Sequence, residues 1–353
     1  MTARRLHRWL GLLLGGWFVV LGLTGAVLVY WHALEAAELP RPASGEALPL
    51  QQLFEAAVRH MRDVPWRIFP ADEHRDHALA IFLTDEGRRT LHLDPTSGEV
   101  QAILPWRGAV VHWLYDMHAN ALSGQTGKLL VGLTAIPLLL GLAMGLRLWL
   151  RRGAVPLRES VVPIAGLRGR RRLSNWHRAI AIWSFLPLVL AVASGLPVSF
   201  PDTTRQVLQP VLAASPAFRV APAKGLGPVD LDGAVALALA ALPGWRLGWA
   251  EAPPDVGEPE WMLVLLRQAH AWPSGRAAAW VNAETGRLEE VRLPDGVDHA
   301  RAWIRALHEG RIFGTAHRWS VIVSGAAMVV LAVLGVLLWW RSRRRVAAVP
   351  AAA

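Results

Sequence analysis

The chain has 353 residues, of which 53% are hydrophobic, with a formal net charge of +10 and no cysteine. The hydrophobic fraction is high for a soluble protein and typical of a chain that lies partly in a membrane. The lack of cysteine excludes disulfides, iron–sulfur clusters and cysteine-ligated zinc sites.

Four runs lack charged residues for long enough to cross a bilayer, which takes roughly 20 residues of helix. They are residues 10–31, 129–146, 179–201 and 319–340. The second run reaches that length only if Arg147 extends its guanidinium to the interface. The first run is too long for the core of a signal peptide. We therefore expect a membrane α-helical protein with four transmembrane helices.

The basic residues predict how these helices are oriented. Segments 1–9, 147–178 and 341–353 together carry 16 Lys and Arg residues against one acidic residue, Glu159. Positive charge stays on the cytoplasmic side of short loops. We therefore expect a multi-pass membrane protein with both termini in the cytoplasm. The basicity, including the Arg cluster at 168–172, is then an orientation signal and no argument for a nucleic-acid partner.

The two long segments on the outer side have globular composition and follow one pattern. Each begins with an amphipathic helix, at Leu50–Met61 and at 231–242, followed by a strand that begins Trp-Arg-aliphatic at Trp66 or Trp245. Further strands are expected at 78–83, 90–93, 261–266 and 278–281, with tight turns at 94–98 and 282–286. Loops rich in Pro, Gly and Ala are expected at 213–228 and 251–259. We interpret the segments as two small periplasmic α+β modules.

The expected organisation is a helix–module–helix unit that occurs twice. It consists of a first transmembrane helix, a first module, an interfacial segment with the second helix, a cytoplasmic loop, a third helix, a second module, an interfacial segment with the fourth helix, and a cytoplasmic tail. The boundaries are 1–32, 33–104, 105–150, 151–175, 176–201, 202–298, 299–341 and 342–353.

Four histidines occupy matching places in the two halves. Thr24-Gly25 lies 17 and 18 residues after His7, and Ser194-Gly195 lies equally far after His177. His118 and His308 each have a Trp five residues before and a Gly six residues after. Further matches follow each of them, a Gly after 27 residues, a Trp after 31 and an Arg after 33. So many matches in register predict a duplicated unit.

The topology sorts these histidines into two pairs. His7 and His177 begin membrane runs on the expected cytoplasmic side, whereas His118 and His308 precede runs on the outer side. Facing helices of a four-helix bundle build cofactor sites from such side chains. From His308 to Arg341 a continuous helix would be about 50 Å long, which exceeds the bilayer core of roughly 30 Å. We therefore expect a helix break near Gly310 and Gly314.

The chain resembles the PepSY-associated transmembrane family, iron-regulated inner-membrane proteins that include ferric-siderophore reductases. In the first half the resemblance rests on Leu6-His7-Arg8-Trp9-Leu10-Gly11 with Thr24-Gly25, and on Met117-His118-Ala-Asn-Ala-Leu122 with Gly127. In the second half it rests on Trp176-His177-Arg178, on 307–314 and on 337–341. The chain departs from the family pattern after His177, where Ala-Ile follows, and at His317, where a Gly is more usual.

The resemblance implies a heme-b protein, with two hemes, that transfers electrons across the membrane to a ferric siderophore in the periplasm. His7 with His177, and His118 with His308, would be the axial iron ligands, and His112 and His317 are reserve candidates on the outer side. Arg8 and Arg178 are candidates to pair the heme propionates. Trp17, Trp183 and Trp319 are candidates to lie beside the rings. We expect the electrons to come from a cytoplasmic reductase or a quinol, since no flavin or nicotinamide motif is present.

Other interpretations of these residues remain open. A single His beside Arg at a helix start is often only an interfacial residue, and the small residues of the helices fit close helix packing as well as packing around a cofactor. The other histidines are expected to be interfacial or to belong to the modules. Alternative functions are a non-catalytic membrane regulator that binds a peptide or protease, and a siderophore permease. Few charges lie within the spans, which argues against a coupled transporter.

Overall fold

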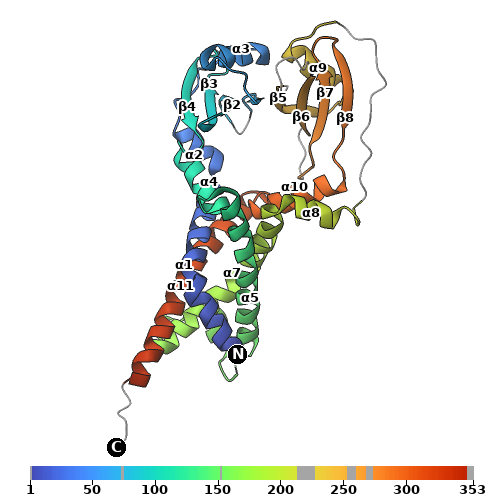
Figure 1. Cartoon of the computed structure of the whole chain (residues 1–353). Coiled ribbons are helices and arrows are strands. Elements are labelled where there is room, and N and C mark those ends of the chain that lie inside the picture. Colours follow the sequence, from blue (N-terminus) through green and yellow to red (C-terminus); the bar gives the residue numbers. More distant parts are fainter. Residues whose placement is uncertain are drawn as a thin grey trace, which may run out of the picture. The chain divides into compact units, whose positions relative to one another are not determined.

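The computed structural model describes residues 2–72, 75–151, 153–212, 227–252, 260–267 and 273–347 (Figure 1). The chain divides into two compact units. The helical unit contains Met1–Val29, Leu114–Thr204 and Ile304–Ala353. The sheet unit contains Tyr30–Trp113 and Arg205–Trp303. Each unit is thus assembled from stretches that are distant in the sequence.

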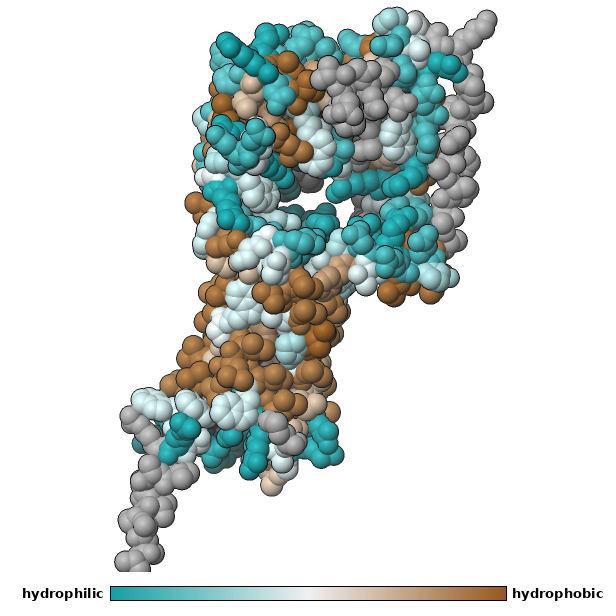
Figure 2. Space-filling view, in the orientation of Figure 1, coloured by the Kyte–Doolittle hydropathy of each residue, from teal (hydrophilic) through white to brown (hydrophobic). Residues whose placement is uncertain are grey.

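Four long helices make up most of the helical unit. They are α1 (Ala3–Leu28), α5 (Gly124–Leu150), α7 (Gly169–Ser199) and α11 (Gly314–Ala347). All four are long and apolar enough to cross a membrane, as the sequence predicts. Hydrophobic side chains cover the middle of this unit in Figure 2. Many of them are exposed, for example Leu13 and Leu186, which fits a surface that faces lipid tails.

The four helices form a closed bundle in which α1 contacts α11 and α5, and α7 contacts α11 and α5. A Cβ on Gly22 of α1 would lie 3.2 Å from the backbone oxygen of Gly325 in α11, so these two backbones approach closely. The starts of α1 and α7 and the ends of α5 and α11 share one end of the bundle, which we call the basic end. Arginines are concentrated at this end.

Each of the second and fourth long helices follows a shorter helix after a break. The helix α4 (Val110–Asn120) ends before Ala121 and Leu122, whose φ angles are +47° and +56°. The helix α10 (Gly296–His308) ends before Gly310, at φ +72°, and α11 begins at Gly314, at φ +56°. The expected break between His308 and the fourth span is therefore confirmed.

The sheet unit contains one antiparallel sheet of eight strands in the order β4-β3-β2-β1-β5-β6-β7-β8. Its first half comprises β1 (Arg67–Phe69), β2 (Ala78–Thr84), β3 (Gly87–Leu93) and β4 (Val100–Pro105). Its second half comprises β5 (Trp245–Glu251), β6 (Glu260–Arg267), β7 (Ala277–Asn282) and β8 (Arg287–Arg292). The remaining helices of the chain are α2 (Trp31–Ala37), α3 (Leu50–Met61), α6 (Leu157–Val161), α8 (Pro201–Leu208) and α9 (Leu231–Ala241).

The two predicted modules are joined, because β1 pairs with β5. Arg67 lies opposite Glu251 at this seam, and the two side chains form an ion pair of 2.6 Å. The N-termini of α3 and α9 also cap each other. Asp232 of α9 accepts hydrogen bonds from the N–H groups of Leu50 and Gln51, and the Gln51 side chain accepts one from Leu231 N–H. One hydrophobic core runs through both halves.

Most expected elements of the sheet unit are present, and α3 has the predicted bounds. Two strands were not expected. They are β4, which ends in a proline, and β8, whose sequence RLEEVR is largely charged. Both are edge strands, where such residues are tolerated because one side of the strand carries no partner. The expected loops at 213–228 and 251–259 lie mostly outside the described residues, and Glu251 belongs to β5.

Candidate functional site

The first histidine pair lies at the basic end of the bundle. His7 is in the first turns of α1, and His177 is in the early part of α7. The centres of their imidazole rings are 6.3 Å apart, and the ring planes are nearly perpendicular at 83°. Two side chains separated by 170 positions in the chain therefore face one another, as the symmetry of the sequence predicts.

The second pair lies at the opposite end of the bundle. His118 is near the end of α4, and His308 is the last residue of α10. Their ring centres are 6.0 Å apart with an interplanar angle of 38°. The structure thus brings together the same two pairs that the sequence predicts, and each pair takes one histidine from each half of the chain.

The hydrogen bonds of the rings determine which nitrogen is free. His7 Nδ1 donates to the backbone oxygen of Gly141 at 2.9 Å, and His308 Nδ1 donates to that of Ala191 at 2.9 Å. A carbonyl oxygen can only accept, so each Nδ1 carries the proton, and the lone pair of a neutral ring is on Nε2. A hydrogen bond of this kind from the second nitrogen is what orients histidines that bind metals.

The other two histidines have comparable surroundings. His118 Nδ1 lies 3.0 Å from Thr24 Oγ1, which itself donates to the Val20 carbonyl and so accepts from the ring. The backbone carbonyl of Leu21 also interacts with His118. His177 Nδ1 makes no hydrogen bond within the described residues, but the backbone carbonyl of Leu331 interacts with this ring.

Three glycines leave the space that the rings occupy. A Cβ on Gly25 would lie 2.9 Å from His118 Cε1, and a Cβ on Gly195 would lie 2.9 Å from His308 Cε1. A Cβ on Gly145 would lie 3.2 Å from His7 Cε1. Carbon atoms in ordinary contact are about 3.5–4.0 Å apart. These glycines therefore allow close approach of imidazole to helix backbone, which the sequence could not separate from close helix packing.

Burial disfavours the doubly protonated form of both rings of the second pair. Burial, with a smaller effect of the neighbouring His308, lowers the pKa of His118 to about 4. Burial also lowers the pKa of His308. Both residues lie in the short helices that precede the membrane spans. A neutral imidazole is the form that binds a metal.

The helices set the distance between the two pairs. His7 and Thr24, the partner of His118, are 17 residues apart on α1, which corresponds to about 25 Å along a helix. His177 and Ala191, the partner of His308, are 14 residues apart on α7, or about 21 Å. The pairs are thus separated by most of the roughly 30 Å thickness of a bilayer core.

The candidate propionate partners differ in their surroundings. Arg8 is exposed, and its guanidinium carbon lies 5.8 Å from the centre of the Trp9 ring. Arg178 is partly buried, and its Nε has no hydrogen-bond acceptor among the described residues. A buried guanidinium nitrogen without an acceptor fits a site for an anionic group.

The reserve ligands lie in other environments. His112 belongs to the sheet unit, where its Nε2 lies 3.1 Å from Glu35 Oε1 and its ring stacks on Trp106. His317 is in the first turn of α11, where its ring centre lies 5.6 Å from that of Phe313. Neither ring forms a ring contact with one of the four core histidines in the described part of the chain.

A buried polar cluster in the sheet unit was not anticipated. His92 of β3 is fully buried, and neither ring nitrogen has a partner among the described residues. Its ring centre lies 6.0 Å from that of His77. Burial lowers the pKa of His92 to about 4, against the opposing field of Glu35. Burial would by itself raise the pKa of Glu35, but its hydrogen bond and charge interaction with His112 outweigh burial and lower it. The alternation of β3 predicted a strand here but not that its histidine would be buried.

The remaining aromatic candidates are placed as follows. Trp17 donates to Thr134 Oγ1 at 3.3 Å within the bundle, whereas Trp183 and Trp319 are largely exposed. In the sheet unit, Trp245 and Trp261 pack against the core, and Arg67 lies over the Trp66 ring at 3.6 Å. His74, His270 and Trp272 lie outside the described residues.

The comparisons with known proteins agree with this architecture. The family described as PepSY-associated TM region matches residues 4–342, which is nearly the whole chain. A comparison with curated proteins finds no match.

Proposed function

The chain belongs to the PepSY-associated TM region family, and from that premise we propose that it is a heme-b protein of the bacterial inner membrane. In this proposal it transfers electrons from the cytoplasmic side to the iron of a ferric siderophore in the periplasm. The observation that carries the proposal is the geometry of the two histidine pairs.

The spacing of the rings fits bis-histidine ligation of an iron. A metal–nitrogen bond to histidine is about 2 Å long, so two such bonds, with the half-width of each ring added, place the ring centres about 6 Å apart. The observed distances are 6.3 Å and 6.0 Å. The protonated Nδ1 atoms of His7, His118 and His308, the lowered pKa values of the last two, and the glycines against the rings support the same interpretation.

The contacts of the rings also support a duplicated unit. Gly141 lies 23 residues after His118, and Leu331 lies 23 residues after His308. Leu21 lies 14 residues after His7, and Ala191 lies 14 after His177. The carbonyls near the four rings are therefore at equivalent positions of the two halves, and those of Gly141 and Ala191 accept a hydrogen bond from a ring nitrogen. A coincidence of local packing would not reproduce both spacings.

Heme b, when bound, would supply the one-electron redox chemistry. The chain's own residues would do the rest. His7 with His177, and His118 with His308, would hold one iron each, and the surrounding carbonyls would fix the ring orientation. Arg178, and Arg8 at the same end, would pair with propionates. The bundle would keep water away from the path.

The expected orientation follows from charge. The 16 basic residues of segments 1–9, 147–178 and 341–353 favour a cytoplasmic basic end, with both termini inside. The site that His7 and His177 would hold then lies on the side of the electron donor, a quinol or a cytoplasmic reductase. The site that His118 and His308 would hold lies on the side of the chelate. One electron converts the ferric ion of the chelate to ferrous iron, which hard oxygen ligands of a siderophore hold less tightly.

A stopped-flow experiment tests the proposal. The purified protein, reduced anaerobically with dithionite and freed of excess reductant, is mixed with a ferric hydroxamate siderophore and a ferrous-iron trap. We expect its heme absorbance to return to the oxidised spectrum as trapped ferrous iron appears in equal amount. A protein that contains heme but is not reoxidised by the chelate would refute the substrate. A folded protein without heme would leave a regulator or a permease as the better interpretation.

A further inference from the structure

A hollow at the basic end of the bundle is not explained by electron transfer. Its volume is about 790 Å³, and it lies between the α6 segment and the start of α7. Four arginines and one acidic residue line it, namely Arg168, Arg170, Arg171, Arg178 and Glu159. Its charged groups therefore sum to a clear positive excess.

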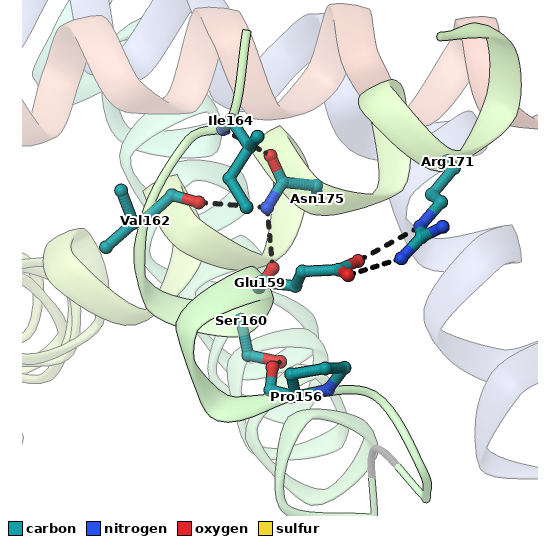
Figure 3. A network of polar contacts seen from close by, with 7 residues as sticks. All are labelled: Pro156, Glu159, Ser160, Val162, Ile164, Arg171 and Asn175. Atoms are coloured by element: carbon teal, nitrogen blue, oxygen red, sulfur yellow. Dashed lines mark hydrogen bonds and ion pairs between the residues drawn. The ribbon is translucent and has the colours of Figure 1, made fainter. Parts of the chain in front are cut away.

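The loop that contributes Glu159 to this hollow is held by hydrogen bonds to a single buried side chain (Figure 3). Asn175 of α7 is fully buried. Its Nδ2 donates to the backbone oxygens of Glu159 and Val162 at 2.6 Å and 2.9 Å, and its Oδ1 accepts from Ile164 N–H at 2.8 Å. The loop between the two spans is therefore held against α7 rather than left to solvent.

Two tryptophans hold the same loop. The indole of Trp149 in α5 donates to the Ser160 backbone oxygen at 3.1 Å, and that of Trp183 in α7 donates to the Val161 oxygen at 2.8 Å. An orientation signal needs only the charge of its arginines, not a loop with fixed carbonyls. The fixed loop implies a hollow whose shape exists before anything binds, which lowers the entropic cost of binding.

The arginines of the hollow are not equivalent. Arg171 forms a two-pronged ion pair with Glu159, whose pKa is lowered chiefly by this hydrogen bond (Figure 3). Arg168 and Arg170 form no ion pair with a carboxylate in the part of the chain that the structure describes. Glu159, the one acid of the hollow, is thus already satisfied. With Arg178 assigned to a heme propionate under the proposed function, the guanidinium groups of Arg168 and Arg170 remain for an external anion.

We propose that this hollow binds a phosphate ester. Guanidinium groups match the oxygens of phosphate through two parallel hydrogen bonds, and several of them together bind it better than one. The volume exceeds that of a bare phosphate and lies in the range of small-ligand sites. Arg168 and Arg170 lie at the start of α7, before the charge-free run at 179–201, so they would lie near the headgroups of a bilayer that this run spans. An anionic phospholipid and a soluble phosphate ester present the same chemistry.

The test uses the full-length protein with two probes. In the lipid arm, the protein is placed in nanodiscs of phosphatidylcholine with a minor share of phosphatidylglycerol, and native mass spectrometry counts the phosphatidylglycerol molecules retained. In the soluble arm, flavin mononucleotide is titrated in phosphatidylcholine nanodiscs at about 150 mM salt, where distant charges are screened. Binding in the first arm alone identifies a headgroup, and binding in the second identifies a soluble ester.

The variant Arg168→Gln/Arg170→Gln should lose the binding by about tenfold or more, since charge-assisted hydrogen bonds are removed. The variant Arg168→Lys/Arg170→Lys keeps the charge but not the forked geometry of the guanidinium groups, and its affinity for the probe should fall by less. Arg4→Gln/Arg5→Gln is the matched control. It removes two exposed charges from the same end of the bundle, outside the hollow, and should change binding by less than about twofold.

Three results would overturn the proposal. They are equal affinity of the wild type and the Arg168→Gln/Arg170→Gln variant in both arms, an equal loss in the control, and a loss of heme in the Arg168→Gln/Arg170→Gln variant. An equal loss in the control would mean diffuse attraction by net charge. A loss of heme would assign these arginines to the histidine pair of the basic end instead. Phosphate binding does not depend on heme, so the proposal can fail or hold independently of the proposed function.

Discussion

Substitution of Gly25 by alanine should displace the ring of His118 although neither histidine of the pair His118 and His308 is replaced. The new Cβ would lie 2.9 Å from His118 Cε1, whereas such atoms prefer about 3.5–4.0 Å. The ring must therefore move by roughly 0.5–1 Å. Metal–ligand distances tolerate only about 0.2 Å, so the ring cannot keep its ligand position.

The expected cost is that of an overpacked site, about 1–3 kcal/mol. The gain in helix propensity from Gly to Ala is about 1 kcal/mol, and it acts on the fold rather than on the ring. We therefore expect heme affinity at the outer pair to fall about tenfold or more, since about 1.4 kcal/mol is a factor of ten. The pyridine hemochrome assay, with protein measured separately, gives the number of hemes per chain.

Gly16→Ala is the matched control, because it lies on the same helix and a Cβ there has nothing within 4 Å. It should keep the wild-type heme content. Full heme content and an unchanged midpoint potential in Gly25→Ala would contradict the displacement of the His118 ring. So would an equal loss of heme in Gly16→Ala.

Three further predictions concern single contacts. Thr24→Val removes the acceptor of His118 Nδ1 and should weaken heme binding about tenfold to a hundredfold. Ser194→Ala should leave heme binding unchanged, because the Ser194 hydroxyl bonds the carbonyls of Leu190 and Ala191 rather than His308. Equal effects of the two variants in a heme-release assay would contradict this. Asn175→Ala removes three hydrogen bonds and should lower the free energy of unfolding by about 1–3 kcal/mol. The control Ser174→Ala should keep the melting temperature of the wild type. The pKa of His92 is lowered from 6.5 to about 4, so the contribution of this residue to the free energy of unfolding should be full above pH 6.5 and fall as the pH drops towards 4. His92→Leu should flatten this part of the profile of melting temperature against pH. An unchanged slope would refute the role of His92.

The sequence was sufficient to pair the histidines because the chain carries the same landmarks in both halves. His7 with His177, and His118 with His308, followed from register and topology alone, and charge-free length predicted the four spans. The helix break after His308 was predicted because an unbroken helix from His308 to Arg341 would be about 50 Å long, against a bilayer core of roughly 30 Å.

Other features could not be derived from local pattern. The pairing of β1 with β5 joins two strands that are distant in the sequence, and the Arg67–Glu251 ion pair across it could not be told in advance from the chain's other charged residues. Gly22 and Gly25 are three positions apart on α1, yet one packs against Gly325 and the other against an imidazole. In the sequence, a glycine that contacts a helix backbone cannot be distinguished from one that contacts a histidine ring. The hollow at the basic end depends on Asn175, a single side chain whose carbonyl partners are set by the path of the loop.

The reduced-minus-oxidised visible spectrum of the purified chain, with heme counted per chain, tests the central claim most directly. The two pairs predict two hemes with the sharp α-band of bis-histidine heme b. His7→Ala and His118→Ala should each leave one heme, and the double variant should leave none. A colourless wild-type protein that is fully folded, or a His118→Ala variant that keeps both hemes, would contradict the account.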